Sequence, residues 1–315
     1  MSDKKLFGWV TPAERTPAQH EANERILAGM PKFQLIGNYR EEKGKWFLWE
    51  FAKRVNGGKH IRYVNQVTGS CVGAGGGNAV KTLAHVEIAN GDPEEWPKDE
   101  FWWLYTYGQS RKRAGLGGRG EGSFGSAYAE AIVKDGIFFR TEGKEANASL
   151  PDYEYRDGWI RLPQSVEMEW SDGASKNIEP FKSLGLKHLV KTAAKINSSD
   201  EAKAAIANGY PITIASNFGT RTIRAQGNPQ VQLAEWDDRW PHQMHCCACW
   251  DHPDLGLIFY ILNNWGSDAH PNPLNDEPPG GFWIRASTFD LMLKDEGFAL
   301  SALNGFLVRE LSWYI

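Results

Sequence analysis

Residues 65–74 read Asn-Gln-Val-Thr-Gly-Ser-Cys-Val-Gly-Ala, and the prediction of the fold begins from them. Stop signals follow at Asn90-Gly91 and Pro93, so we expect a helix that begins at or near Cys71 and ends there. A helix N-terminus favours the thiolate form of a cysteine. Small residues flank the sulfur on both sides and leave room for a substrate. Cys71 is therefore a candidate nucleophile.

A nucleophilic cysteine needs a base, and it needs hydrogen-bond donors for the oxyanion that forms during attack. Gln66 carries a side-chain amide five residues before Cys71, and with the Cys71 N–H it would supply two donors. His245 opens the apolar run 246–250, which is typical of a buried strand, and we expect it to be the base. Asn263 follows the strand-like run 257–262 and would fix the tautomer of the imidazole.

Three blocks in this order resemble the signature blocks of papain-like cysteine peptidases: 66–74, His245 with its apolar run, and Asn263-Asn264-Trp265-Gly266. Segments 121–137, 204–212 and 282–284 resemble the bacterial and viral branch, so the resemblance runs from about residue 61 to about residue 300. It implies Cys71 as nucleophile, His245 as general base and acid, Asn263 as its orienter, Gln66 as oxyanion donor and Trp265 as a shield of the His–Asn contact. It implies no metal or organic cofactor.

The order of the predicted elements indicates an α+β fold. Helices are predicted over 71–90, 99–113, 123–135 and 198–207, and strands over 211–215, 257–262 and 281–284. The resemblance implies a two-lobed papain-like fold, in which a helical lobe with a central nucleophile helix packs on an antiparallel β-barrel-like lobe. We expect the active site in the cleft between the lobes.

Three segments are expected along the chain. Residues 1–60 are rich in charge and contain one predicted helix over 17–28, so we interpret them as an arm across the body or a prosegment-like extension. Residues 61–150 form the mainly helical lobe and 151–315 the mainly β lobe of one catalytic unit. Extra loops are predicted at 220–241 and 269–279, and the second could overhang the cleft.

Composition narrows the function classes. The 315 residues are 41% hydrophobic and 23% charged, which predicts a globular protein, and the formal net charge of -4 argues against a nucleic-acid partner. No stretch has the roughly 20 apolar residues of a membrane span, and the N-terminus lacks the apolar core of a signal peptide. We therefore expect a cytoplasmic or virion-associated protein with a peptide or protein substrate and no membrane partner.

The remaining cysteines cluster at 246, 247 and 249, and we interpret them as reduced, small core residues. Together with His242, His245 and His252 they also resemble a zinc ligand set. We rank that interpretation lower, because successive residues of a strand point to opposite faces. His20, His60, His85 and His270 receive no role.

The leading functional hypothesis is a thiol peptidase or amidase with a Cys-His-Asn triad, whose thiolate should dominate at neutral pH. The alternative is a catalytically idle papain-like domain that serves as a structural or binding component of a larger assembly, such as a virus particle. Two features favour the alternative: the spacing from Gln66 to Cys71 is one residue shorter than in papain, and four glycines follow the nucleophile, at 73, 75, 76 and 77.

Overall fold

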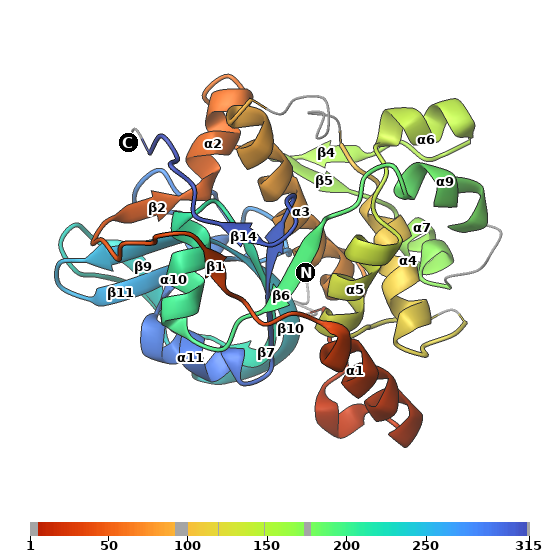
Figure 1. The fold of residues 1–315 in the computed structure, drawn as a ribbon, viewed down its shortest axis with the longest axis horizontal. Coiled ribbons are helices and arrows are strands. Elements are labelled where there is room, and N and C mark those ends of the chain that lie inside the picture. The colour runs from red at the N-terminus through yellow and green to blue at the C-terminus, as the bar shows by residue number, and fades with distance from the viewer. Residues whose placement is uncertain (1–5, 92–99, 119, 148, 173–177, 314–315) are drawn as a thin grey trace.

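Two lobes meet along one long helix in the computed structural model of the chain (Figure 1). The structure describes residues 6–91, 100–118, 120–147, 149–172 and 178–313. The long helix is α3 (Cys71–Ala89), which begins at the residue predicted from the sequence. It lies between a group of helices and a large sheet, and nearly all of its residues are buried.

The helical lobe consists of short helices and a small sheet. Its helical elements are α4 (Trp103–Arg113), α5 (Gly125–Lys134), α6 (Arg140–Ala146), α7 (Gln164–Trp170), the 3-10 turn η2 (Glu179–Phe181) and α9 (Lys182–Gly185). The small sheet has the order β3-β5-β4, with β3 (Tyr63–Val64), β4 (Glu154–Arg156) and β5 (Trp159–Arg161). The predicted helix over 123–135 corresponds to α5, and the one over 99–113 starts later, at Trp103.

The other lobe is built on a nine-stranded sheet of order β6-β13-β7-β10-β11-β12-β9-β8, with β2 paired to β10. Its neighbours are antiparallel except β12 and β9, which run parallel. The strands are β2 (Lys45–Phe47), β6 (Thr192–Lys195), β7 (Ile212–Gly219), β8 (Ile223–Gln226), β9 (Val231–Ala234), β10 (Asp238–His252), β11 (Gly256–Leu262), β12 (Gly281–Arg285) and β13 (Glu296–Ser301). Helices α10 (Ser199–Ala207) and α11 (Ala286–Leu293) pack on this sheet.

Residues 6–60 are spread over both lobes. The 3-10 turn η1 (Pro12–Glu14) leads into α1 (Pro17–Gly29), which packs on α5 of the helical lobe. In contrast, β1 (Leu35–Ile36) pairs with β14 (Phe306–Leu307) near the other chain end, and α2 (Leu48–Val55) packs on α3. Residues 6–60 therefore contribute to the core as well as to the surface.

The two segments predicted as extra loops behave differently. Residues 220–241 form β8, β9 and the beginning of β10, so the prediction of a loop there is wrong. The segment 231–234 has only four residues, so its apolar residues give too short a pattern to predict a strand. Pairing with β12 stabilises it as a strand. Residues 263–280, by contrast, contain no helix or strand, and Ala269 to Pro271 line a cavity beside the cleft.

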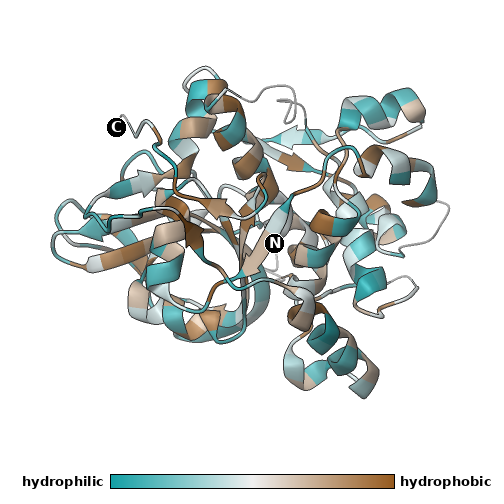
Figure 2. Ribbon diagram, in the orientation of Figure 1, coloured by the Kyte–Doolittle hydropathy of each residue, from teal (hydrophilic) through white to brown (hydrophobic). Residues whose placement is uncertain are grey.

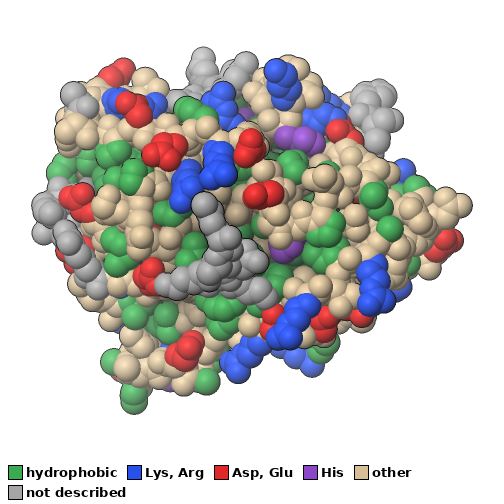
Figure 3. Space-filling view, turned by 180° about the vertical axis from the view of Figure 1, so that it is seen from behind, with side chains coloured by type: hydrophobic (Ala, Val, Ile, Leu, Met, Phe, Trp, Pro, Cys, Tyr) green, Lys and Arg blue, Asp and Glu red, His purple; other side chains and the backbone are tan. Residues whose placement is uncertain are grey.

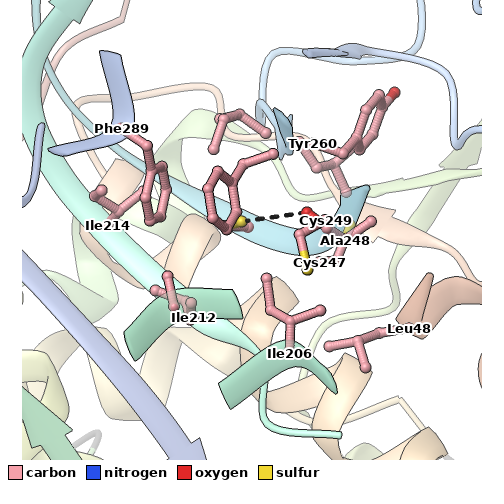
Figure 4. Close-up of a cluster of buried hydrophobic side chains, with 14 of the residues drawn as sticks. Leu48, Ile206, Ile212, Ile214, Cys247, Ala248, Cys249, Tyr260 and Phe289 are labelled. Atoms are coloured by element: carbon pink, nitrogen blue, oxygen red, sulfur yellow. Dashed lines mark hydrogen bonds between the residues drawn. The ribbon is translucent and has the colours of Figure 1, made fainter. Parts of the chain in front are cut away.

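Hydropathy follows the layering. Hydrophobic colours dominate the central strands, whereas α1 and α6 are mostly hydrophilic (Figure 2). On the face seen in Figure 3, side chains of both charge signs are interspersed. Cys247 and Cys249 lie among apolar side chains that include Leu48 and Ile206 (Figure 4). All four cysteines are free and buried, as small core residues would be.

The glycines of α3 allow other segments to approach this helix closely. A Cβ on Gly75 would lie 2.6 Å from the carbonyl oxygen of Gln243 in β10, and one on Gly76 would lie 2.2 Å from the ring of Tyr128. A side chain at either position would push α3 away from its neighbours. The glycines that seemed out of place in a helix are thus required by its packing.

We predict that Gly75→Ala destabilises the protein. The added methyl group meets backbone atoms of β10, and overpacking of this kind costs about 1–3 kcal/mol, more than the gain of up to about 1 kcal/mol in helix propensity. Urea unfolding should show a lower midpoint. Gly29→Ala is the matched control, because a Cβ on Gly29 has open space around it. An equal response of the two variants would contradict the close packing of α3 on β10.

Candidate active site

Cys71 is the first residue of α3 and is completely buried. The N–H of Gln243 donates to its Sγ at 3.4 Å. Gln243 is in β10 and directly follows His242, so the sulfur at the helix N-terminus lies beside the histidine-bearing part of the sheet. The thiol thus lies on the long helix between the lobes, and β10 of the large sheet supplies the N–H that contacts it.

His242 is the histidine that pairs with Asn263. Its Nε2 is 2.8 Å from Oδ1 of Asn263, and both residues are fully buried. Its Nδ1 is buried and has no hydrogen-bond partner among the described residues. The ring of Trp265 lies 4.6 Å from the His242 ring, centroid to centroid. An imidazole held by Nε2 and free at Nδ1 is prepared to accept a proton at Nδ1.

The prediction that His245 would contact Asn263 is wrong. The ring nitrogens of His245 contact Oγ1 of Thr82 at 2.9 Å and the carbonyl oxygen of Ile212 at 3.2 Å. Thr82 is eleven residues after Cys71 in the same helix, which places it about 16 Å along the axis from the nucleophile. His245 is therefore a satisfied core residue.

His245 was predicted in place of His242 because the sequence pattern placed the start of the strand too late. The apolar run 246–250 suggested that the strand begins at His245, but β10 begins at Asp238 and its first residues are polar. His242 and His245 are three residues apart, and an odd spacing tends to place side chains on opposite faces of a strand. A search for a histidine upstream of the apolar run would have found His242.

A segment from near the N-terminus covers the site. We call residues Leu6–Val10 the strap. The N–H groups of Gly8 and Trp9 both donate to the carbonyl oxygen of Pro241, at 3.3 and 3.2 Å. On the other side, the N–H of Ser123 donates to the carbonyl oxygen of Gly8 at 2.9 Å, and the N–H of Val10 donates to that of Ser123 at 3.0 Å. Backbone bonds to both lobes therefore hold the strap across the cleft.

Gln66 also contacts the strap. Its Nε2 donates to the carbonyl oxygen of Leu6 at 3.1 Å and to that of Thr68 at 2.7 Å. Nε1 of Trp265 donates to the same Leu6 oxygen at 3.2 Å. The amide predicted to stabilise an oxyanion thus already binds a peptide carbonyl oxygen. This contact leaves no signal in the sequence, because a strap of five residues has no periodicity.

A buried carboxylate anchors the strap. Glu296 accepts from Nε1 of Trp9 at 3.1 Å and forms an ion pair with Arg15 at 2.7 Å, with side chains that are 5% and 2% exposed. It also accepts from the backbone N–H groups of Gly125 and Ser126 at the start of α5. Trp9 itself is 2% exposed, so its indole is part of the core.

Burial keeps the thiol and the imidazole neutral in this covered state. It raises the pKa of Cys71 to about 12, although the N–H groups of Gln243, Gly8 and Val72 oppose the rise. It lowers the pKa of His242 to about 4. In the covered site this direction opposes the thiolate predicted at neutral pH, because the loss of hydration outweighs the helix N-terminus.

Glu167 of α7 shapes the loop that precedes the nucleophile. Its carboxylate accepts from the N–H groups of Val67 and Thr68 and from the hydroxyls of Thr68 and Ser70, the last at 2.8 Å. Burial raises its pKa to about 7 against these bonds. Glu167 thus fixes the path of the chain between Gln66 and Cys71, a role that its place in sequence does not reveal.

The zinc interpretation finds no matching geometry. His252 contacts the carbonyl oxygen of Pro229 at 2.7 Å, and His242 and His245 have the separate partners described above. Within the described ranges, no three His, Cys, Asp or Glu side chains converge as metal ligands. In the same ranges, no helix is long and apolar enough to cross a membrane.

The fold is similar to that of solved cysteine proteases. The chain is similar to xylellain, a cysteine protease from Xylella fastidiosa, with a TM-score of 0.51 and 17% identity over 87% of this chain and 96% of that one. It is also similar to proCathepsin B S9 from Trypanosoma congolense, with a TM-score of 0.56 and 10% identity over 94% of this chain and 86% of that one. Neither a family model nor a curated protein sequence matches the chain. The likeness confirms the predicted α+β, papain-like fold.

We predict that acid destabilises the protein through its buried histidines. Burial lowers the pKa of His242 and of His245 from 6.5 to about 4. As the pH falls from 6.5 towards 4, the unfolded chain binds these protons first, so the free energy of unfolding falls, by about 1.4 kcal/mol per group for each unit of pKa difference. Above pH 6.5 this contribution is complete.

Urea midpoints measured between pH 7 and pH 4.5 test this. His245→Asn should reduce the slope of stability against pH, whatever it does to stability at pH 7. His20→Asn is the control, since His20 is exposed and should leave the slope unchanged. A slope that is the same in His245→Asn and in the parent would show that another group causes the acid sensitivity.

Proposed function

We propose that the chain is a cysteine peptidase or amidase whose triad is Cys71, His242 and Asn263. The observation that carries the proposal is the 2.8 Å contact of His242 with Asn263 beside a cysteine at a helix N-terminus. Papain-like structural neighbours that are cysteine proteases support it. Segments 121–137 and 204–212 favour the bacterial and viral branch of that family.

The proposed reaction begins when the strap leaves the cleft and water reaches the pair. The proton of the Cys71 thiol passes to Nδ1 of His242, and the thiolate attacks the carbonyl carbon of a peptide or amide. Nε2 of Gln66 and the N–H of Cys71 stabilise the oxyanion. His242 then protonates the leaving amine, and a water molecule, deprotonated by His242, releases the acid from the sulfur.

The contacts of Gln66 with Leu6 support this role. A donor that already binds a carbonyl oxygen of an extended chain is suited to bind the carbonyl oxygen of a substrate. Trp265 packs on His242 and would shield the imidazole and its amide partner from water. A hydrogen bond that is shielded from water in this way is stronger.

We also propose that residues 1–60 act as a prosegment-like extension of one catalytic unit with two lobes. In this proposal the helical lobe continues past the expected boundary between 61–150 and 151–315, because β4, β5, α7 and α9 pack with it. The strap supports the first part, because it occupies the cleft with backbone hydrogen bonds. The substrate would then be a peptide or protein that takes the place of the strap.

We predict that Gly8→Ala opens the site. A Cβ on Gly8 would lie 1.8 Å from the carbonyl oxygen of Gly69, so the strap no longer fits over Cys71. Overpacking that costs about 1–3 kcal/mol would raise the open population by about 5-fold to 150-fold. Iodoacetamide should then alkylate Cys71 faster at pH 7, and peptide mapping should find the label there rather than on Cys246, Cys247 or Cys249. Gly29→Ala is the control.

We predict that substitutions of His242 and His245 have different effects in the Gly8→Ala background. His242→Ala should lower hydrolysis of a peptide library by about 10²–10⁴-fold, as the loss of a general base does. His245→Ala should mainly lower the urea midpoint, because it removes the buried partner of Thr82. Asn263→Ala should lower turnover more than stability. Equal loss of turnover in His242→Ala and His245→Ala would contradict the proposed triad.

The idle domain remains the second candidate, because burial raises the pKa of Cys71 to about 12. Thiol reactivity separates the two. If Gly8→Ala exposes Cys71 and the thiol still reacts only above about pH 8, as an unperturbed cysteine does, the result supports the idle domain with a structural role. If the thiol reacts at mildly acidic pH and His242→Ala removes this reactivity, the result supports the cysteine peptidase.

A further inference from the structure

The side-chain amide of Asn263 lies between two imidazole rings. Its Oδ1 is 2.8 Å from Nε2 of His242, and its Nδ2 is 2.8 Å from Nε2 of His270. His242 belongs to β10, whereas His270 comes from the segment 263–280 that joins β11 to β12. His270 takes part in no step of the proposed reaction.

Backbone geometry determines which end of the amide faces which ring. The oxygen and nitrogen of an amide are assigned from their partners. The N–H of Asn264 lies 2.7 Å from Oδ1 of Asn263, and an N–H only donates, so this atom must be the oxygen. Nδ2 therefore faces His270. Because the amide nitrogen also only donates, Nε2 of His270 must accept, and the ring must carry its proton on Nδ1.

The ring of His270 is held by the same sheet that carries His242. Trp240 of β10 stacks on it with an angle of 16° between the planes and 6.0 Å between the centroids. Phe282 of β12 meets it edge-on at 4.9 Å. His270 also lines a cavity of about 700 Å³ next to Gln66 and Trp265. Packing from two strands thus places the acceptor before any substrate arrives.

We propose that His270 is a positioning residue that keeps the Asn263 amide in the orientation His242 requires. This inference rests on the proposed function. If the amide turned over, Nδ2 would face the N–H of His242 and the N–H of Asn264 would lose its acceptor. The bond to His270 opposes that turn, because Nδ2 would lose its own acceptor as well. A reversed amide would favour the wrong tautomer of His242 for taking the proton of Cys71.

Two substitutions in the Gly8→Ala background isolate the acceptor from the packing. His270→Phe keeps an aromatic ring between Trp240 and Phe282 but has no acceptor. His270→Gln keeps an acceptor oxygen at a similar reach. Asp268 and Arg221, which line the same cavity, are unchanged in both. The measurement is the rate of Cys71 alkylation by iodoacetamide from pH 5 to pH 9, together with the urea midpoint.

His270→Phe should shift the alkylation profile up by about one pH unit, which lowers the rate at pH 6 roughly tenfold. His270→Gln should stay within about twofold of the parent, since an acceptor of the same reach preserves the bond. The urea midpoint of His270→Phe should lie below that of His270→Gln, because phenylalanine leaves Nδ2 of the buried Asn263 without an acceptor, so the alkylation profile is the readout that separates positioning from stability. A parental profile in His270→Phe would overturn the inference, and so would equal shifts in both variants.

His242→Ala in the same background distinguishes this inference from the proposed function. If His242→Ala leaves the alkylation profile unchanged, the Cys71–His242 pair does not exist, and the proposed function fails together with the inference. If His242→Ala changes the profile but His270→Phe does not, only the role of His270 is wrong.

Discussion

The packing of α3 on β10 is the constraint on which the site depends. Gly75 lets the backbone of Gln243 come against the helix, and the N–H of the same Gln243 reaches the sulfur of Cys71. The residue before Gln243 is His242, so this single approach places the sulfur beside the residue that follows the imidazole in β10. A slip of one residue in β10 would turn His242 to the other face of the sheet, and the site would be lost.

Local signals were sufficient to predict the fold class and the start of α3, since each depends on residues that are close in sequence. They also pointed to Asn263, although its contact is with His242 and not with His245. The histidine depends instead on the register of a strand of fifteen residues, and an apolar run marks the middle of such a strand better than its beginning. The strap and Glu167 were missed for a related reason. Their partners are distant in sequence, and neither has a repeating pattern.

In the covered site, burial favours the neutral forms of the Cys71 thiol and the His242 imidazole, because it raises the pKa of the first and lowers the pKa of the second. One charged pair near the strap is that of Glu296 with Arg15, whose side chains are almost completely buried. A buried pair of this kind costs free energy to break, because one partner is left without its counter-charge. The strap is therefore coupled to the stability of the fold through Glu296 and the buried indole of Trp9.

The strap is joined to the body by the chain itself, and this changes how other molecules compete for the cleft. A tethered segment acts as a ligand with an effective concentration in the millimolar range when the linker is short and flexible. A free peptide with the same backbone hydrogen bonds to Pro241 and Ser123 would have to exceed that concentration to displace it. Occupancy of the cleft is thus set by the length and stiffness of the link after Val10 as much as by the contacts that the strap makes.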